Sequence, residues 1–100
     1  MMKIKSEYSD LDKYEEDNGD IFYCKKDTKL LHNSYGAAVV SEYGHKEYWI
    51  NNKKHRLDGP AIICDHGLEE YWINHINLTK EEFEIKRLKF LGKEHLMCII

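Results

Sequence analysis

The chain is poor in cysteine, and the number of cysteines is odd. Its 100 residues include Cys24, Cys64 and Cys98, which lie far apart in the sequence. Small domains that depend on disulfides usually carry cysteines in even number and at close spacing. The sequence therefore argues against a disulfide framework and favours reduced thiols in a cytoplasm.

Long apolar runs and a basic excess are also lacking. No stretch approaches the ~18 apolar residues that a membrane-spanning helix needs, and the N-terminus has no apolar core of the signal-peptide type. The formal net charge is −3 at pH 7, whereas nucleic-acid-binding proteins normally show an excess of basic residues. We expect a cytoplasmic protein that does not associate with membranes and is unsuited to general nucleic-acid binding.

Sequence motifs of catalysis are missing. There is no Ser-His-Asp order, P-loop, Gly-x-Gly-x-x-Gly or paired-carboxylate motif. Six histidines occur without the ligand spacing that zinc sites show: His32, His45, His55, His66, His75 and His95. We therefore expect no enzymatic activity, no metal and no cofactor. Two of these histidines, His32 and His55, occupy equivalent positions of a repeat, which suggests a structural contact in a turn.

What the chain does contain is one block of sequence that occurs twice. Residues 32–51 align without a gap on residues 55–74, and Tyr-Trp-Ile-Asn recurs unchanged at 48–51 and 71–74. A fixed period of this size is typical of stacked copies of one supersecondary unit. Arrays of such units usually provide surfaces for binding.

Each copy has the pattern of a β-hairpin. Two β-prone runs (37–41 and 46–50, then 61–64 and 69–73) flank a short turn that contains Gly44 or Gly67. Glycine suits a turn position that requires positive φ. A degenerate half-unit at residues 18–25 precedes the first copy. Residues 18–77 therefore predict two and a half hairpin repeats, or about five strands in an antiparallel meander.

The segments on either side differ from the repeats. Residues 1–17 are polar and acidic, and they predict a terminus that is mobile or loosely docked. Within it, residues 2–5 could form a short strand and residues 11–16 one helical turn. Residues 78–100 predict a C-terminal helix followed by an apolar tail at 96–100.

The start and end of that helix are marked in the sequence. Thr79 and Glu82 form a capping box, and Gly92 is a suitable stop. An apolar stripe of Phe83, Leu88 and Leu91, with Ile85 nearby, predicts about three amphipathic turns. The expected fold class is thus mainly β (α+β): an antiparallel meander of repeated β-hairpins with a C-terminal α-helix, in a single domain of residues 1–100.

The second copy resembles a known repeat. His-Arg-Leu-Asp-Gly-Pro-Ala at 55–61, Asp-His-Gly at 65–67 and Glu-Tyr-Trp-Ile-Asn at 70–74 are similar to the short β-hairpin repeat of bacteriophage and large DNA virus proteins. That repeat is distantly similar to the MORN repeat. The resemblance covers residues 18–77, although Asn33, Tyr35 and Ala37 replace Arg, Asp and Pro in the first copy. It implies a hairpin architecture and a viral origin, and no common activity.

The aromatic pairs are the first candidate site. Neighbouring residues of a strand point to opposite faces, so Tyr48 and Tyr71 should form one ladder and Trp49 and Trp72 another. We expect one ladder to pack against the C-terminal helix and the other to remain partly open to a partner, because Trp and Tyr dominate interface hot spots. The alternative is that both ladders pack within the molecule.

Charged residues offer weaker candidates. Asp58 favours a turn in which it bonds backbone N–H groups, and Arg56 is expected to pair with an acid on a neighbouring strand, such as Glu47. A set of lysines could touch phosphate or, as we prefer, protect sheet edges from aggregation. The set consists of Lys25, Lys26, Lys29, Lys46, Lys53 and Lys54.

Together these features favour a non-enzymatic protein-binding module encoded by a phage or virus. In the host cytoplasm it would occlude a surface of a host protein, for example a CRISPR-type defence nuclease, as an anti-defence inhibitor. The predicted partner-binding residues are Tyr48, Trp49, Tyr71, Trp72, Arg56, Glu47 and Glu70. The alternatives are a self-associating structural protein, with a homodimer formed through an edge strand or the C-terminal tail, and a weak nucleic-acid binder.

Overall fold

The computed structural model describes residues 1–92 and confirms the expected fold class. An eight-stranded antiparallel sheet of hairpins is followed by helix α1 (Lys80–Phe90). The strands of this sheet, in their spatial order, are β1 (Met2–Ile4), β2 (Leu11–Glu15), β3 (Ile21–Lys25), β4 (Val39–Val40), β5 (Lys46–Glu47), β8 (Ile62–Ile63), β9 (Glu69–Ile73) and β10 (Ile76–Leu78). A separate pair is formed by β6 (Trp49–Ile50) and β7 (Lys53–Lys54).

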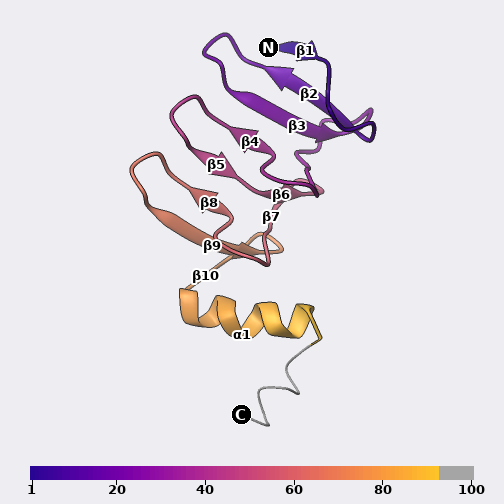
Figure 1. Ribbon diagram of the computed structural model, residues 1–100. Helices are drawn as coiled ribbons and strands as arrows, with labels where there is room; N and C mark the ends of the chain where they lie inside the picture. The colour runs from indigo at the N-terminus through magenta and orange to yellow at the C-terminus, as the bar shows by residue number, and fades with distance from the viewer. Residues whose placement is uncertain (93–100) are drawn as a thin grey trace.

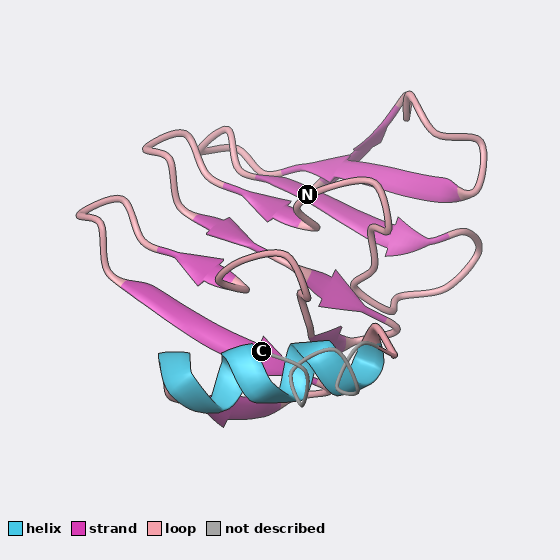
Figure 2. Ribbon diagram, turned by 60° about the horizontal axis from the view of Figure 1, so that its bottom comes forward, coloured by secondary structure: helices cyan, strands magenta, loops and turns pink. Residues whose placement is uncertain are grey.

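The hairpins are stacked along one direction of the molecule. Figure 1 shows them following one another in chain order from β1 at one end to β10, which lies beside α1 at the other end. The principal extents are 51 × 30 × 19 Å, so the molecule is elongated. In the turned view of Figure 2 the helix lies along the last hairpin. Each unit therefore contacts mainly its neighbours, as in other repeat arrays.

The glycine turns are the first kind of turn in the sheet, and the sequence predicted them. Gly19, Gly44 and Gly67 have φ of 93°, 92° and 92°, a region that a side chain opposes. The turns close with matching backbone bonds, such as Ser41 N–H to the carbonyl of His45 at 2.9 Å and Cys64 N–H to that of Leu68 at 2.8 Å. The half-unit and the two copies thus share one hairpin geometry.

A second kind of turn was not predicted. Asn51 and Asn52 have φ of 48° and 66°, and Asn74 and His75 have φ of 49° and 68°. Two consecutive residues with positive φ suit the tight turns that match the twist of paired strands. These turns create β7 and β10, two strands that the sequence did not predict. The chain therefore has more than the five strands that the sequence predicted.

Two histidines stabilise these turns, as their repeat positions suggested. The Nδ1 atom of His32 accepts the backbone N–H of Asn51 at 2.9 Å, and Nδ1 of His55 accepts that of Asn74 at 3.0 Å. Burial lowers the pKa of both histidines, and Lys25 adds to the effect at His32. A neutral imidazole is required here, because a protonated Nδ1 cannot accept a hydrogen bond.

The N-terminal prediction was wrong in part. A strand at residues 2–5 is confirmed by β1, but residues 11–16 form β2 in place of a helical turn. β2 pairs with the whole of β3, from Leu11 opposite Lys25 to Glu15 opposite Ile21. The free edge of β3 offers backbone hydrogen bonds to any neighbouring extended segment, and this tertiary pairing overrides the local preference.

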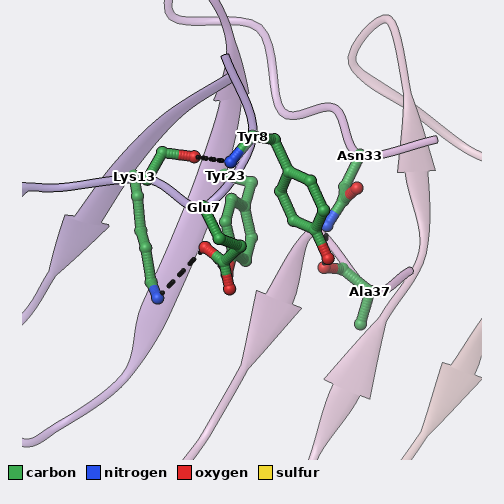
Figure 3. Close-up of polar contacts among 7 residues, drawn as sticks. Glu7, Tyr8, Lys13, Tyr23, Asn33 and Ala37 are labelled. Carbon is green, nitrogen blue, oxygen red and sulfur yellow. Dashed lines mark hydrogen bonds and ion pairs between the residues drawn. The ribbon is translucent and has the colours of Figure 1, made fainter. Parts of the chain in front are cut away.

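Side chains also anchor this terminus to the repeats. The Tyr23 hydroxyl donates to a Glu7 carboxylate oxygen at 2.9 Å, and Lys13 Nζ donates to the same oxygen at 3.3 Å. Figure 3 shows Lys13 pointing toward Glu7 beside the Tyr23 ring. The Tyr8 ring stacks on Tyr35 with centroids 4.4 Å apart. The expectation of a mobile or loosely docked terminus was therefore wrong.

The C-terminal helix begins and ends where the sequence indicated. Thr79 and Glu82 form both bonds of the capping box, and Gly92 has φ of 68°. Only Phe83 is fully buried, whereas Ile85 and Leu91 are 54% and 42% exposed, so the predicted broad apolar stripe was wrong. The physical reason is that α1 packs mainly on the last hairpin, formed by β9 and β10. Beyond it the helix meets the Leu57 carbonyl through Arg87 and the ring of His55 through Phe90. The predicted apolar tail lies outside the described residues.

Small residues let the stacked units approach closely. Ala38 and Ala61 are fully buried at equivalent positions of the two copies. Each donates its N–H to the carbonyl of a glutamate, Glu47 at 2.8 Å and Glu70 at 2.9 Å. No helix in the described part of the chain has the length and hydropathy to cross a membrane.

Candidate partner-binding face

The two tryptophans lie in the same setting on one face of the array. The indole Nε1 of Trp49 donates to Oε1 of Glu47 at 2.8 Å, and that of Trp72 donates to Oε1 of Glu70 at 2.9 Å. Partners two residues apart in a strand share a face, so both glutamates are on the tryptophan side. Each charge-assisted bond restricts its indole to one orientation. All four side chains are partly exposed.

Two further residues lie between the indoles. Lys54 Nζ lies 4.1 Å from the ring centroid of Trp72 and 5.7 Å from that of Trp49. The His75 ring is tilted against both indoles at 5.8 Å. We call this set the indole face: Glu47, Trp49, Lys54, Glu70, Trp72 and His75. It combines two indole rings, one imidazole ring, two carboxylates and one ammonium group.

Cation–π contacts add to the order of the indole face. Each is worth about 0.5–1 kcal/mol at an exposed site. Glu47 is further fixed by His45, whose Nε2 lies 2.8 Å from the second carboxylate oxygen. The face is therefore held in a single arrangement before any partner arrives, which lowers the entropic cost of binding.

The tyrosines of the repeated motif make separate contacts. Tyr71 is half-buried and packs against Phe83 of α1, with ring centroids 4.7 Å apart; it shares a face of β9 with the buried Ile73. Tyr48 does not reach the helix, because the guanidinium of Arg56 lies 3.9 Å from its ring centroid. The prediction that a whole ladder packs on the helix was thus half right. The seven predicted site residues thus fall into three sets: the two Glu–Trp pairs, Tyr48 with Arg56, and Tyr71 against the helix.

Arg56 and Asp58 do not make the predicted contacts. Arg56 Nε donates to Asp58 Oδ1 at 2.9 Å and Nη1 donates to the Pro60 carbonyl at 3.0 Å. The predicted pair of Arg56 with Glu47 was wrong, because Glu47 lies on the indole side and is bound there. In the first copy Asn33 takes over the contact of Arg56 by donating to the Ala37 carbonyl at 2.9 Å.

A groove of about 550 Å³ opens beside Arg56 and Tyr48. Its lining comes from the loops that join the units: Asn33, Ser34, Tyr35, Gly36, Tyr48, Ile50, His55, Arg56, Leu57 and Asp58. Sequence reasoning did not identify this groove. Arg56, the one cationic side chain of this lining, already donates to Asp58 and to the Pro60 carbonyl.

A smaller and more apolar pocket of about 270 Å³ lies near the N-terminal end of the sheet. It is lined by Met1, Tyr14, Glu16, Phe22, Cys24, Lys29 and Leu31. Sequence reasoning also missed these residues. Aligning the half-unit with the two full copies would have drawn attention to Cys24, which stands where the copies have tryptophan.

The lysines do not form one continuous stripe. Lys54 is engaged by the indoles, and Lys25 Nζ donates to the side chain of Asn51 at 3.2 Å. Lys29 lines the small apolar pocket. Within residues 1–92 no group of three or more His, Cys, Asp or Glu side chains is arranged to hold a metal ion. Cys24 and Cys64 are free thiols.

Comparison of the chain with protein-family models, curated proteins and solved structures found no match. The likeness to the viral hairpin repeat stays a prediction.

Proposed function

We propose that this chain is a non-enzymatic protein-binding module whose partner docks on the indole face. The observation that carries the proposal is the repetition of the Glu–Trp bond at Glu47–Trp49 and Glu70–Trp72, with indoles that stay partly exposed. Packing of the helix does not account for this face, because Phe83 contacts Tyr71, which alternates with Trp72 along β9 and so points to the opposite side. Partly exposed tryptophans held in one orientation are typical of interface hot spots.

The chemistry of the face defines the kind of partner. Two indole rings offer flat apolar area, and Glu47 and Glu70 border them with negative charge. A protein surface that presents apolar side chains flanked by Arg or Lys complements this arrangement. The proposal includes a viral protein that acts in the host cytoplasm by covering a surface of a host protein such as a CRISPR-type defence nuclease.

The engaged state of the polar groups supports a binding role over a catalytic one. Arg56, Asp58, His32 and His55 are each committed to a structural contact. Free thiols at Cys24 and Cys64 are compatible with a cytoplasmic location.

Capture from host lysate followed by reconstitution with the purified partner tests the proposal. Trp49→Ala and Trp72→Ala should each weaken binding by at least about tenfold, as expected for hot-spot residues. Tyr43→Ala is the matched aromatic control, because Tyr43 is 78% exposed, lies in the glycine turn and is not a member of the indole face. Circular dichroism must show that the variants remain folded. Equal affinity for the wild type and both tryptophan variants would contradict the proposal.

Self-association is the second candidate, and one observation favours it. Ile85, Phe90 and Leu91 of the helix region are 54%, 46% and 42% exposed, which leaves apolar side chains at one end of the array. Sedimentation of the purified chain over a range of concentrations distinguishes the two functions. A stable dimer that survives Trp49→Ala but is lost on Phe90→Ala would favour self-association over the indole face.

A further inference from the structure

The small apolar pocket occupies the place of a missing indole. Cys24 pairs with Leu31 across a β-bridge, just as Trp49 pairs with Lys54 and Trp72 with Asn77. The three positions are therefore equivalent in backbone structure. In the half-unit the large indole is replaced by a thiol, and the 270 Å³ pocket lies against that thiol.

The residues next to Cys24 are also more apolar than the residues at the equivalent positions of the two copies. Phe22 stands where the two copies have Glu47 and Glu70, and Leu31 stands where the first copy has Lys54. Tyr14 pairs with Phe22 in the adjacent strand and lines the same pocket. The polar neighbours of the two tryptophans are thus replaced by the apolar side chains of Phe22 and Leu31, while Glu16 and Lys29 add one charge of each sign to the lining.

Size and polarity agree with an aromatic occupant. An apolar cavity of about 150 Å³ holds one benzene ring, so a pocket of about 270 Å³ has room for a bicyclic ring. Burial raises the pKa of the Cys24 thiol, and Asp12 adds to this effect. The thiol therefore stays protonated at neutral pH and forms an uncharged floor.

The pocket also has an acceptor for an indole N–H. Glu16 lines it, and within residues 1–92 its carboxylate is engaged only by an exposed pair with the N-terminal amino group at 3.9 Å. In the two full copies a glutamate accepts each indole N–H. Glu16 can supply the same bond from a different strand end.

We propose that this pocket receives a tryptophan side chain from the partner protein, which completes the row begun by Trp49 and Trp72. This inference rests on the proposed protein-binding function and names the group that the partner inserts. The two indoles of the chain itself are the template for the geometry, and Glu16 replaces Glu47 and Glu70 as acceptor. The pocket and the indole face then form one continuous docking surface.

Titration of the full-length chain with N-acetyltryptophanamide tests the pocket directly. The probe is followed by ¹H–¹⁵N chemical shifts, and any tag is placed at the C-terminus because Met1 lines the pocket. We expect saturable shifts centred on Phe22, Cys24 and Leu31, and none with N-acetylalaninamide at equal concentration. Absence of saturable shifts at these amides up to the solubility limit of the probe overturns the proposal.

Variants at the floor and at the acceptor sharpen the test. Cys24→Trp should fill the pocket with the chain's own indole and weaken probe binding by at least about tenfold. Cys24→Ala is the matched control and should bind the probe within about twofold of the wild type. Glu16→Gln should weaken N-acetyltryptophanamide and leave an N-methylindole analogue unaffected. The wild-type titration decides the matter even if Cys24→Trp does not fold.

The outcome for the pocket is separable from the outcome for the function. A captured partner that binds Cys24→Trp as tightly as the wild type, yet is lost on Trp72→Ala, overturns the pocket and leaves the protein-binding module standing. The opposite result supports the pocket. In that case, changing a single tryptophan of the partner to alanine weakens binding to the wild-type chain but does not weaken binding to Cys24→Trp.

Discussion

Replacing Phe83 by alanine separates the helix from the array, and its cost can be worked out from the structure. Phe83 is 2% exposed and packs on Tyr71 at 4.7 Å between ring centroids. Removing a fully buried phenyl ring costs about 3–5 kcal/mol, because transfer energy is lost and a cavity remains. A domain of this size has a total stability of about 5–15 kcal/mol, so Phe83→Ala should be close to the limit of folding.

The matched control lies on the same helix. Phe90 is 46% exposed and meets the ring of His55 edge-on at 5.9 Å between ring centroids, so Phe90→Ala should cost less than about 1 kcal/mol. Urea unfolding followed by circular dichroism and by tryptophan fluorescence measures both variants. If the two variants agree within about 0.5 kcal/mol, the helix does not stabilise the sheet through Phe83 and our account of the core is refuted.

Two further predictions concern the turns. The folded-state pKa values of His32 and His55 lie below the ordinary value. The hydrogen bonds of these histidines therefore stabilise the fold fully above about pH 6.5. This stabilisation is lost as the pH falls below that value, because protonation removes the Nδ1 acceptor. His55→Gln should reduce the loss of stability between pH 7 and pH 5 in denaturant titrations, whereas the exposed His66→Gln should not; equal pH profiles for both would contradict this. Gly44→Ala should cost about 1–2 kcal/mol because φ there is 92°, while Gly36→Ala, where the space is open and φ is not positive, should be neutral or stabilising by up to about 1 kcal/mol. Thermal melting compares the two alanine variants, and a larger loss at Gly36 than at Gly44 would refute the assigned turn.

The parts of the fold that the sequence predicted depend on local chemistry. Turn glycines at 44 and 67, the capping box at Thr79 and Glu82, and the repeated Tyr-Trp pair each specify a conformation through neighbours a few residues away. Because residues 32–51 are repeated at residues 55–74, equivalent residues of the two copies are expected to make equivalent contacts. Both glutamate–indole bonds and both histidine–turn bonds follow that rule.

The parts that sequence reasoning missed depend on contacts between distant segments. Residues 11–15 form a short and mostly polar segment, and this segment becomes a strand because β3 offers a free edge. Arg56 had several acids within reach of its long side chain, and only the arrangement of the loops selects Asp58. The candidate site was likewise predicted as one set, and alternation along the strands divides it between Tyr48 and Tyr71 on one side and the two tryptophans on the other.

The amino-acid order by itself determined the unit: a hairpin that turns at glycine, carries an aromatic pair and is copied before a capped helix. Only the packed molecule decided what becomes of each copy. Tyr71 packs on the helix because Phe83 lies beside it. Tyr48 lies against the guanidinium of Arg56 at the edge of a groove. The pocket at Cys24 lies where the two copies carry an indole. Local rules act over a few bonds of backbone, whereas burial depends on which surfaces meet when the chain is folded.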